Sequence, residues 1–178
     1  MSCFTLSEDR RLLFVCTNHV EASLIVWEIS TNLQLYKLNL PQLSIITCVK
    51  VAYDNNHCAI VGVTPEYVGS LMLLEIHSST IIVQKLFLHS LPYKIRDIAF
   101  IPGYTRRLVS CGIQHMNFWK FNGQSFEFTV GELTIPKAFS SVGAGVYSHS
   151  KENQGKFGLN LVCQDSDMIN TVLKNQKN

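Results

Sequence analysis

The sequence predicts an all-β fold made of repeated units. Apolar residues occur in runs of four to seven, separated by clusters of turn residues, which is typical of short strands joined by turns. No window of the sequence has the 3.6-residue period of an amphipathic helix. Similar residues also recur about every 47 positions, and a period in this range indicates a repeat architecture.

The first two units supply the strands predicted in the first half of the chain. In the first unit, residues 1–4 are what remains of an opening strand, and further strands are expected at 12–17, 24–29 and 33–40. In the second unit, strands are expected at 47–53, 57–63, 71–76 and 81–88. Because the opening strand is short, we expect the chain to be a segment or truncated isoform of a longer protein.

The third unit is the clearest and the fourth is the weakest. Strands are predicted at 95–100, 108–111, 116–119 and 124–133, with turns at Pro102-Gly103 and at 112–115. The fourth unit has candidate strands at 140–147, 157–164 and 168–173, interrupted by a polar insertion at 148–156. The chain therefore divides into units at residues 1–40, 41–90, 91–135 and 136–173, followed by a frayed tail at 174–178.

Counting between units gives their register. The aromatic residue that closes each first strand is predicted at Phe4, Tyr53, Phe100 and Tyr147, and the third-strand position at Trp27, Leu74 and Trp119. Four strands in about 47 residues is typical of a β-propeller blade. The chain is thus predicted to be a partial β-propeller of three to four four-stranded antiparallel blades, an open segment of a larger ring. Unpaired edge strands in such a segment favour self-association.

Composition narrows the function classes. Charged residues make up 16% of the chain, below the usual share of about 25%, so much of the surface is expected to meet protein. A net charge of +2 argues against nucleic acid and acidic membranes as partners. The first residues lack the apolar core of a signal peptide, and six scattered cysteines are typical of free thiols in a reducing compartment. We therefore expect a soluble protein that is cytoplasmic or nuclear.

Several residues could bind a metal or act in catalysis, but each of them also has a structural explanation. His57-Cys58, His115 with Cys111, and His149 with Cys163 lack the paired spacings of structural zinc, so no metal or cofactor is expected. The sequence Ser110-Cys111-Gly112, with His115 nearby, could form a nucleophile and base, but strand packing is the favoured interpretation. The pairs Arg10-Arg11 and Arg106-Arg107 are interpreted as solvated turn residues, and the loops at 64–70, 88–93 and 148–156 as candidate binding loops.

The repeats resemble those of WD-repeat proteins. The resemblance lies in Trp27-Glu28, in Trp119 within LVSCGIQHMNFWKF and in the strand IRDIAF, and it covers residues 1–135 best. The third unit is similar to the tandem-propeller proteins of microtubules, centrioles and cilia, including the echinoderm-microtubule-associated-like group. Ser110 and Trp119 match two members of the hydrogen-bonded set of a WD repeat, but the Asp of the turn between strands two and three is missing.

The resemblance implies a non-catalytic protein–protein interaction scaffold, cytoskeletal, centriolar or ciliary, with tubulin or ciliary and centriolar components as candidate partners. The sequence leaves two alternatives. One is a substrate-recognition or assembly propeller in a ubiquitin-ligase or ribosome-biogenesis complex. The other is a small all-β enzyme that uses Cys111 or His115. Trp27 and Trp119 are expected to be buried between sheets rather than to anchor a partner.

Overall fold

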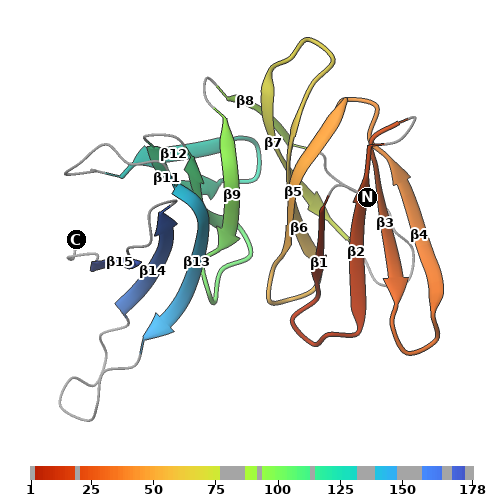
Figure 1. Cartoon of the computed structure of the whole chain (residues 1–178), viewed down its shortest axis with the longest axis horizontal. Helices are drawn as coiled ribbons and strands as arrows, with labels where there is room; N and C mark the ends of the chain where they lie inside the picture. The colour runs from red at the N-terminus through yellow and green to blue at the C-terminus, as the bar shows by residue number, and fades with distance from the viewer. Residues whose placement is uncertain are drawn as a thin grey trace.

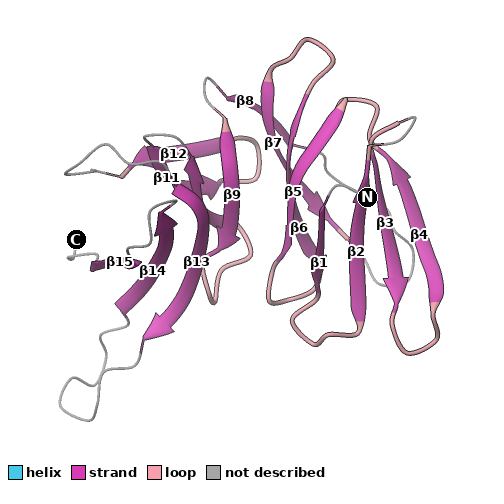
Figure 2. Ribbon diagram, in the orientation of Figure 1, coloured by secondary structure: helices cyan, strands magenta, loops and turns pink. Residues whose placement is uncertain are grey.

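The computed structural model describes residues 3–18, 21–76, 87–91, 94–112, 115–131, 139–147, 158–165 and 170–174. For residues 87–91, and from residue 139 onward except Val142, the backbone alone is described. The described residues contain strands and turns and no helix, as Figure 2 shows. The prediction of an all-β fold is confirmed.

Within the described residues, fifteen strands form four antiparallel sheets in which neighbours in sequence are neighbours in space. Sheet 1 contains β1 (Cys3–Leu6), β2 (Leu12–Thr17), β3 (Ser23–Glu28) and β4 (Leu33–Asn39). Sheet 2 contains β5 (Ile45–Val51), β6 (His57–Val63), β7 (Gly69–Glu75) and β8 (Phe87–Leu91). Sheet 3 contains β9 (Ile95–Phe100), β10 (Arg107–Gly112), β11 (His115–Phe121) and β12 (Phe126–Val130). Sheet 4 contains β13 (Phe139–Tyr147), β14 (Gly158–Asp165) and β15 (Asn170–Lys174).

The sheets follow one another as blades of a partial β-propeller. The first strand of each sheet contacts the first strand of the next, so that β1 packs on β5, β5 on β9, and β9 on β13. In Figure 1 these inner strands follow one another across the molecule, from β1 through β5 and β9 to β13. This arrangement confirms the predicted partial propeller of three to four antiparallel blades.

Apolar side chains fill the two spaces between the first three sheets. The core between sheets 1 and 2 is centred on Phe14, Cys16, Leu24 and Val26 from sheet 1 and on Val49, Cys58, Ile60, Met72 and Leu74 from sheet 2. The core between sheets 2 and 3 contains Cys48, Ala59, Val61, Leu71 and Leu73 from sheet 2 and Ile95, Ile98, Leu108, Trp119, Phe121 and Phe126 from sheet 3. Sheet 2 is therefore apolar on both faces, which explains its nearly continuous hydrophobic strands.

Backbone hydrogen bonds establish which positions of the sheets are equivalent. The first turn is closed by the N–H of Ser7, Ala52 and Ile101, which donate to the carbonyls of Leu12, His57 and Arg107. From these bonds, Trp27, Leu74 and Trp119 occupy the same third-strand position, opposite Leu13, Cys58 and Leu108. The predicted third-strand register is confirmed.

The predicted first-strand register is wrong in two units. The position of Phe100, which pairs with Leu108, is taken by Leu6 in sheet 1 and by Val51 in sheet 2. Tyr53 lies beyond the end of β5 in an exposed turn, and Phe4 lies inside β1. The count failed because it followed aromatic residues, whereas the equivalent positions in sheets 1 and 2 carry the aliphatic residues Leu6 and Val51.

Some element bounds also differ from expectation. The opening strand continues to Leu6, and Gly112 and His115 are strand residues rather than turn residues. Leu91 belongs to β8 and Lys174 to β15. Of the strand expected at 81–88, residues 81–86 lie outside the described residues, as does the insertion at 148–156.

Candidate protein-interaction face on the first sheet

Sheet 1 has two faces, and both are apolar. Phe14, Cys16, Leu24 and Val26 on one face are at most 2% exposed because sheet 2 covers them. Successive residues of a strand point to opposite faces, so the residues between these four point away from sheet 2. Pairing across β1, β2 and β3 aligns them in two rows, Phe4 with Val15 and Ile25, and Leu6 with Leu13 and Trp27. We call these six residues the Trp27 face.

The Trp27 face is open to solvent, although its composition is that of a core. Phe4 is 59% exposed and Leu6 is 44% exposed, whereas Leu13, Val15, Ile25 and Trp27 are partly buried. The equivalent third-strand residues Leu74 and Trp119 are 0% and 2% exposed. The expectation that both tryptophans lie buried between sheets is therefore correct for Trp119 and wrong for Trp27, because no sheet of the described chain packs against this face.

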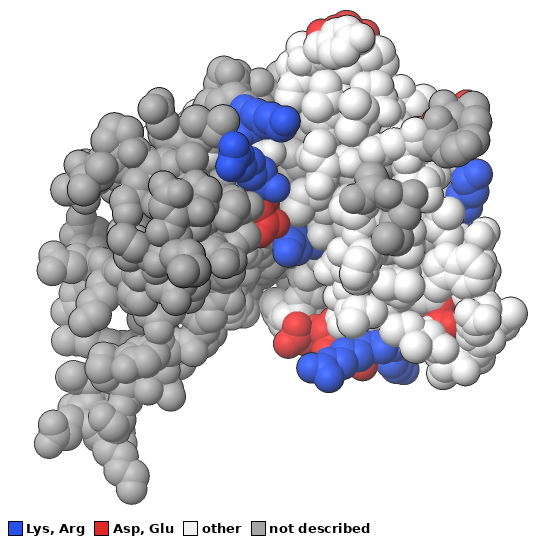
Figure 3. Space-filling model, viewed as in Figure 1, with Lys and Arg blue, Asp and Glu red and all other residues white. Residues whose placement is uncertain are grey.

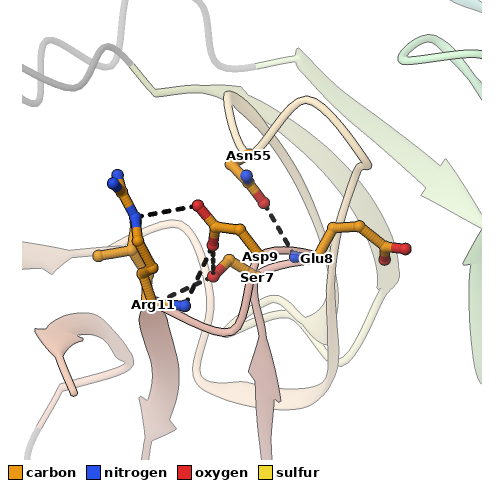
Figure 4. Close-up of polar contacts among 6 residues, drawn as sticks. Ser7, Glu8, Asp9, Arg11 and Asn55 are labelled. Carbon is orange, nitrogen blue, oxygen red and sulfur yellow. Dashed lines mark hydrogen bonds and ion pairs between the residues drawn. The ribbon is translucent and has the colours of Figure 1, made fainter. Parts of the chain in front are cut away.

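A polar turn borders the Trp27 face at the end of β1. The Ser7 hydroxyl donates to Asp9 Oδ1 over 2.6 Å, and Ser7 Oγ accepts from the backbone N–H of Leu12. Arg11 donates to Asp9 through its backbone N–H and pairs with it through Nε over 3.0 Å (Figure 4). The hydrogen bond from Ser7, followed by that from Arg11, lowers the pKa of Asp9. Figure 3 shows charged side chains gathered at this end of the sheet.

The same turn connects sheet 1 to sheet 2. The backbone N–H of Glu8 donates to Asn55 Oδ1 over 2.9 Å (Figure 4). Asn55 is held in the left-handed region at φ 59°, a conformation that Asn tolerates better than most residues. This bond joins the first turns of two blades at the edge of the Trp27 face.

Asp97 connects the inner strands of three sheets. Its Oδ1 accepts from the Cys48 thiol over 3.3 Å and lies 3.5 Å from Lys50 Nζ, both on β5. Its Oδ2 accepts from the backbone N–H of Val142 on β13 over 3.0 Å. Burial, together with the neighbouring Asp97 charge, raises the pKa of Cys48 to about 12. These contacts describe an internal clamp rather than a reactive centre.

The candidate nucleophile and base do not meet in the structure. Cys111 pairs with Met116 and His115 pairs with Gly112, so Cys111 and His115 occupy successive register positions and point to opposite faces of sheet 3. Cys111 is also fully buried. The hypothesis of a Cys111–His115 dyad is therefore wrong.

The metal and basic candidates have structural surroundings. Within the described residues, no three His, Cys, Asp or Glu side chains are placed to hold a metal ion. His57 Nδ1 is hydrogen-bonded to Asp54 Oδ2 at 2.6 Å, while His149 and the side chain of Cys163 lie outside the description. The Arg107 guanidinium lies 4.3 Å from the centre of the Tyr104 ring. The described residues include no helix that is long and apolar enough to cross a membrane.

The sequence signal for the Trp27 face was present but was assigned to burial. Leu13, Val15, Ile25 and Trp27 lie in apolar runs, whereas Leu6 was expected in a polar turn. The period correctly assigned Trp27 to the third-strand position. What the period could not show is which of the equivalent faces has a neighbouring sheet. Of the candidate binding loops, residues 64–70 form a loop in which Tyr67 is 88% exposed. The loop expected at 88–93 is wrong over 88–91, which belong to β8, and residues 92–93 and 148–156 lie outside the described residues.

Comparison with known proteins supports the fold. No protein-family model matches the chain, and no curated protein matches it in sequence. Solved structures do match: hydrazine synthase from Kuenenia stuttgartiensis has a TM-score of 0.66 at 12% identity over 96% of this chain and 57% of that one. The WD40 repeats of RRP9 give 0.58 at 13% identity, over 96% of this chain and 50% of that one. The structure of U3-55K gives 0.57 at 13% identity, over 99% and 52%.

These similarities define the class of fold. The chain has the architecture of a β-propeller, as WD40 structures do, and it spans about half the length of the solved chains it matches. At 12–13% identity the likeness concerns the fold and does not extend to the activities of those proteins.

Proposed function

We propose that this chain is a non-catalytic protein–protein interaction scaffold of the WD-repeat type that binds protein through the Trp27 face. The observation that carries the proposal is the uncovered apolar face of sheet 1, on which Phe4 and Leu6 are 59% and 44% exposed. Exposed apolar surface of this kind in a soluble protein marks an interaction site. The burial of Cys111 supports a role without catalysis.

The cellular assembly and the partners of this scaffold are also proposals. We place the scaffold in a cytoskeletal, centriolar or ciliary assembly in the cytoplasm, with tubulin or ciliary and centriolar components as partners. The resemblance of the third unit to tandem-propeller proteins of these structures supports it. The second candidate is an assembly or substrate-recognition propeller in a ribosome-biogenesis or ubiquitin-ligase complex.

The Trp27 face can be tested by comparing two lysine variants in a pull-down. Tagged full-length chain, its Trp27→Lys variant and its Tyr67→Lys variant are each incubated with purified tubulin and with ubiquitin-ligase subunits. Tyr67 is 88% exposed in the candidate binding loop at 64–70, so its variant tests the alternative binding surface. The proposal predicts that binding is lost with Trp27→Lys and kept with Tyr67→Lys.

The same experiment separates the two candidates. Retention of tubulin supports the cytoskeletal assignment, and retention of ligase subunits supports the alternative. Equal binding by both lysine variants would contradict the assignment of the interaction to the Trp27 face.

A further inference from the structure

The two cysteines of sheet 1 lie directly opposite each other. Cys3 on β1 pairs with Cys16 on β2, so the two side chains stand on the same face of the sheet. Both are free thiols, and they are hydrogen-bonded to one another. Directly opposed Cα atoms of an antiparallel pair are about 4.5–5.5 Å apart, which falls inside the range that a disulfide spans. The backbones of β1 and β2 are therefore already spaced for a disulfide.

This arrangement is particular to sheet 1. The bonds of the first turns show that Cys48 on β5 and Asp97 on β9 occupy the position equivalent to Cys3. The residue opposite Cys48 is Val61. The residue opposite Asp97 is Cys111. Among the described side chains of sheets 1 to 3, a thiol thus stands opposite a thiol in sheet 1 alone.

The two thiols of the pair differ in their access to solvent. Cys3 is partly exposed, whereas Cys16 is 0% exposed in the core between sheets 1 and 2. The hydrogen bond with Cys3, followed by burial, raises the pKa of Cys16, so Cys16 keeps its proton. The other described cysteines, Cys48, Cys58 and Cys111, are buried as well. Cys3 is therefore the described thiol that a dissolved oxidant reaches first.

We infer that Cys3 and Cys16 are a site of reversible oxidation by peroxides, whose disulfide fastens β1 to β2 and holds the exposed edge of the Trp27 face in place. The effect on binding rests on the proposed function, because Phe4 and Leu6 of the Trp27 face belong to β1. β1 has four residues, is the shortest described strand and lies at the edge of its sheet. A covalent tie to β2 reduces the freedom that β1 loses when a partner binds.

The oxidation consumes one peroxide for each disulfide. The Cys3 sulfur attacks a peroxide oxygen, the O–O bond breaks, and hydrogen peroxide is reduced to water while Cys3 becomes a sulfenic acid. The Cys16 sulfur then attacks the sulfenic sulfur of Cys3. The S–S bond forms, the S–O bond breaks, and the hydroxyl leaves as water with the proton of Cys16. Glutathione reverses the oxidation by attacking the disulfide, which restores both cysteine thiols and oxidises glutathione to its own disulfide.

Peptide mapping of the folded full chain tests the site. The chain is treated with hydrogen peroxide, its remaining thiols are blocked with N-ethylmaleimide, and it is then unfolded and digested with trypsin. Cleavage after Arg10 and Arg11 places Cys3 and Cys16 in separate peptides that contain one cysteine each. We expect these peptides to be recovered as one disulfide-linked species, and glutathione treatment before blocking to return both in alkylated form. Cys3 that stays alkylated after peroxide, or that is linked to Cys58 instead, would overturn the inference.

Two variants sharpen the map. Cys48→Ala is the matched control, because Cys48 occupies the same strand position without a thiol opposite, and we expect it to leave the linked species unchanged. In Cys16→Ala, with its fold checked by circular dichroism, we expect the Cys3 sulfenic acid to accumulate and to be trapped by dimedone. Loss of the linked species in Cys48→Ala would overturn the assignment of the pair.

Amide hydrogen exchange, measured by NMR, reports whether the disulfide fastens β1. We expect the backbone amides of residues 4–6 to exchange about tenfold more slowly in the oxidised chain than in the reduced chain, because local opening of β1 then requires β2 to open with it. Cys3→Ala should show the same exchange rates before and after peroxide. Equal rates in the oxidised and reduced chain, with the linked peptide present, would overturn the effect on β1.

A pull-down separates this inference from the proposed function. With tubulin or ligase subunits, we expect the oxidised chain to retain about fivefold more partner than the reduced chain, and Cys3→Ala to be unaffected by oxidation. Equal retention by the two states would overturn the control of the Trp27 face. Retention by neither state would contradict the proposed function instead, and the peptide map and the exchange rates would still decide the disulfide.

Discussion

The indole N–H of Trp119 donates a hydrogen bond to Ser110 Oγ over 2.8 Å, and both residues are buried in sheet 3. The bond joins β11 to β10 beneath the Trp119 ring, which also stacks at a tilt against Phe128 at 4.9 Å and meets the edge of Phe126. The polar end of the indole is thereby satisfied while its apolar surface fills the core with sheet 2.

Removing this hydrogen bond should destabilise the chain measurably. Ser110→Ala removes the Oγ that accepts from the buried indole N–H of Trp119, and we expect a loss of about 1–3 kcal/mol in the free energy of unfolding. Urea denaturation checks this. In a double-mutant cycle, Ser110→Ala should cost much less in a Trp119→Phe background, because phenylalanine has no N–H; equal costs in both backgrounds would contradict the role of the bond.

Equivalent tryptophans should differ in their contribution to stability. Trp119→Ala empties a covered core position and should cost about 3–5 kcal/mol. Trp27→Ala should cost about 1–2 kcal/mol, because part of its ring already lies in water and little burial is lost. Chemical denaturation of both variants tests the difference. Equal losses would show that Trp27 is covered in solution.

Asp97 and Lys50, the two charged residues of the clamp, should contribute unequally to the free energy of unfolding. Asp97→Ala removes the acceptor of the buried Val142 N–H and should cost about 1–3 kcal/mol. Lys50→Ala removes an ion pair whose lysine side chain is 38% exposed, so solvent screening limits its loss to less than about 1 kcal/mol. Urea unfolding of the two single variants gives the comparison, and a larger loss for Lys50→Ala would refute this account of the clamp.

Two glycines should respond differently to substitution. A Cβ on Gly62 would lie 2.5 Å from the Ile45 carbonyl oxygen and 2.9 Å from a Leu43 methyl group, so Gly62→Ala should cost about 1–3 kcal/mol through overpacking. Gly103 has φ +80° and open space around it, so the backbone conformation, and not a clash, limits which residue can replace it. Gly103→Asn should therefore be nearly neutral. Thermal unfolding measures both, and a neutral Gly62→Ala would contradict the close approach.

The buried thiol of Cys48 should make the chain less stable in alkali. Its pKa is raised from 9.0 to about 12 by burial, so the folded state favours the protonated thiol. The contribution is fully present below pH 9 and is lost as pH rises toward 12, because the unfolded chain releases the proton first. Cys48→Ala should reduce the alkaline decline in the free energy of unfolding, measured by urea titration from pH 8 to 11. An unchanged decline would exclude Cys48 as a cause.

Sequence reasoning succeeded where local pattern and spacing were sufficient. Most described strands lie within about two residues of their expected bounds, because apolar runs between turn residues report strands directly. The same third-strand position was assigned correctly to Trp27, Leu74 and Trp119, because it follows from the number of residues between units. Tyr53 was misplaced because an aromatic in a turn and one in a strand look alike in a one-dimensional count.

By itself, the sequence determined that this chain forms short strands in repeated antiparallel sheets, because the alternation of apolar runs and turns is a local property. Only the tertiary structure decided which apolar faces are covered. Trp27 and Trp119 occupy the same third-strand position, opposite Leu13 and Leu108, yet one is partly exposed and the other is buried. The difference arises because burial depends on whether another sheet lies against the face, and that is a property of the assembly of blades rather than of any one repeat.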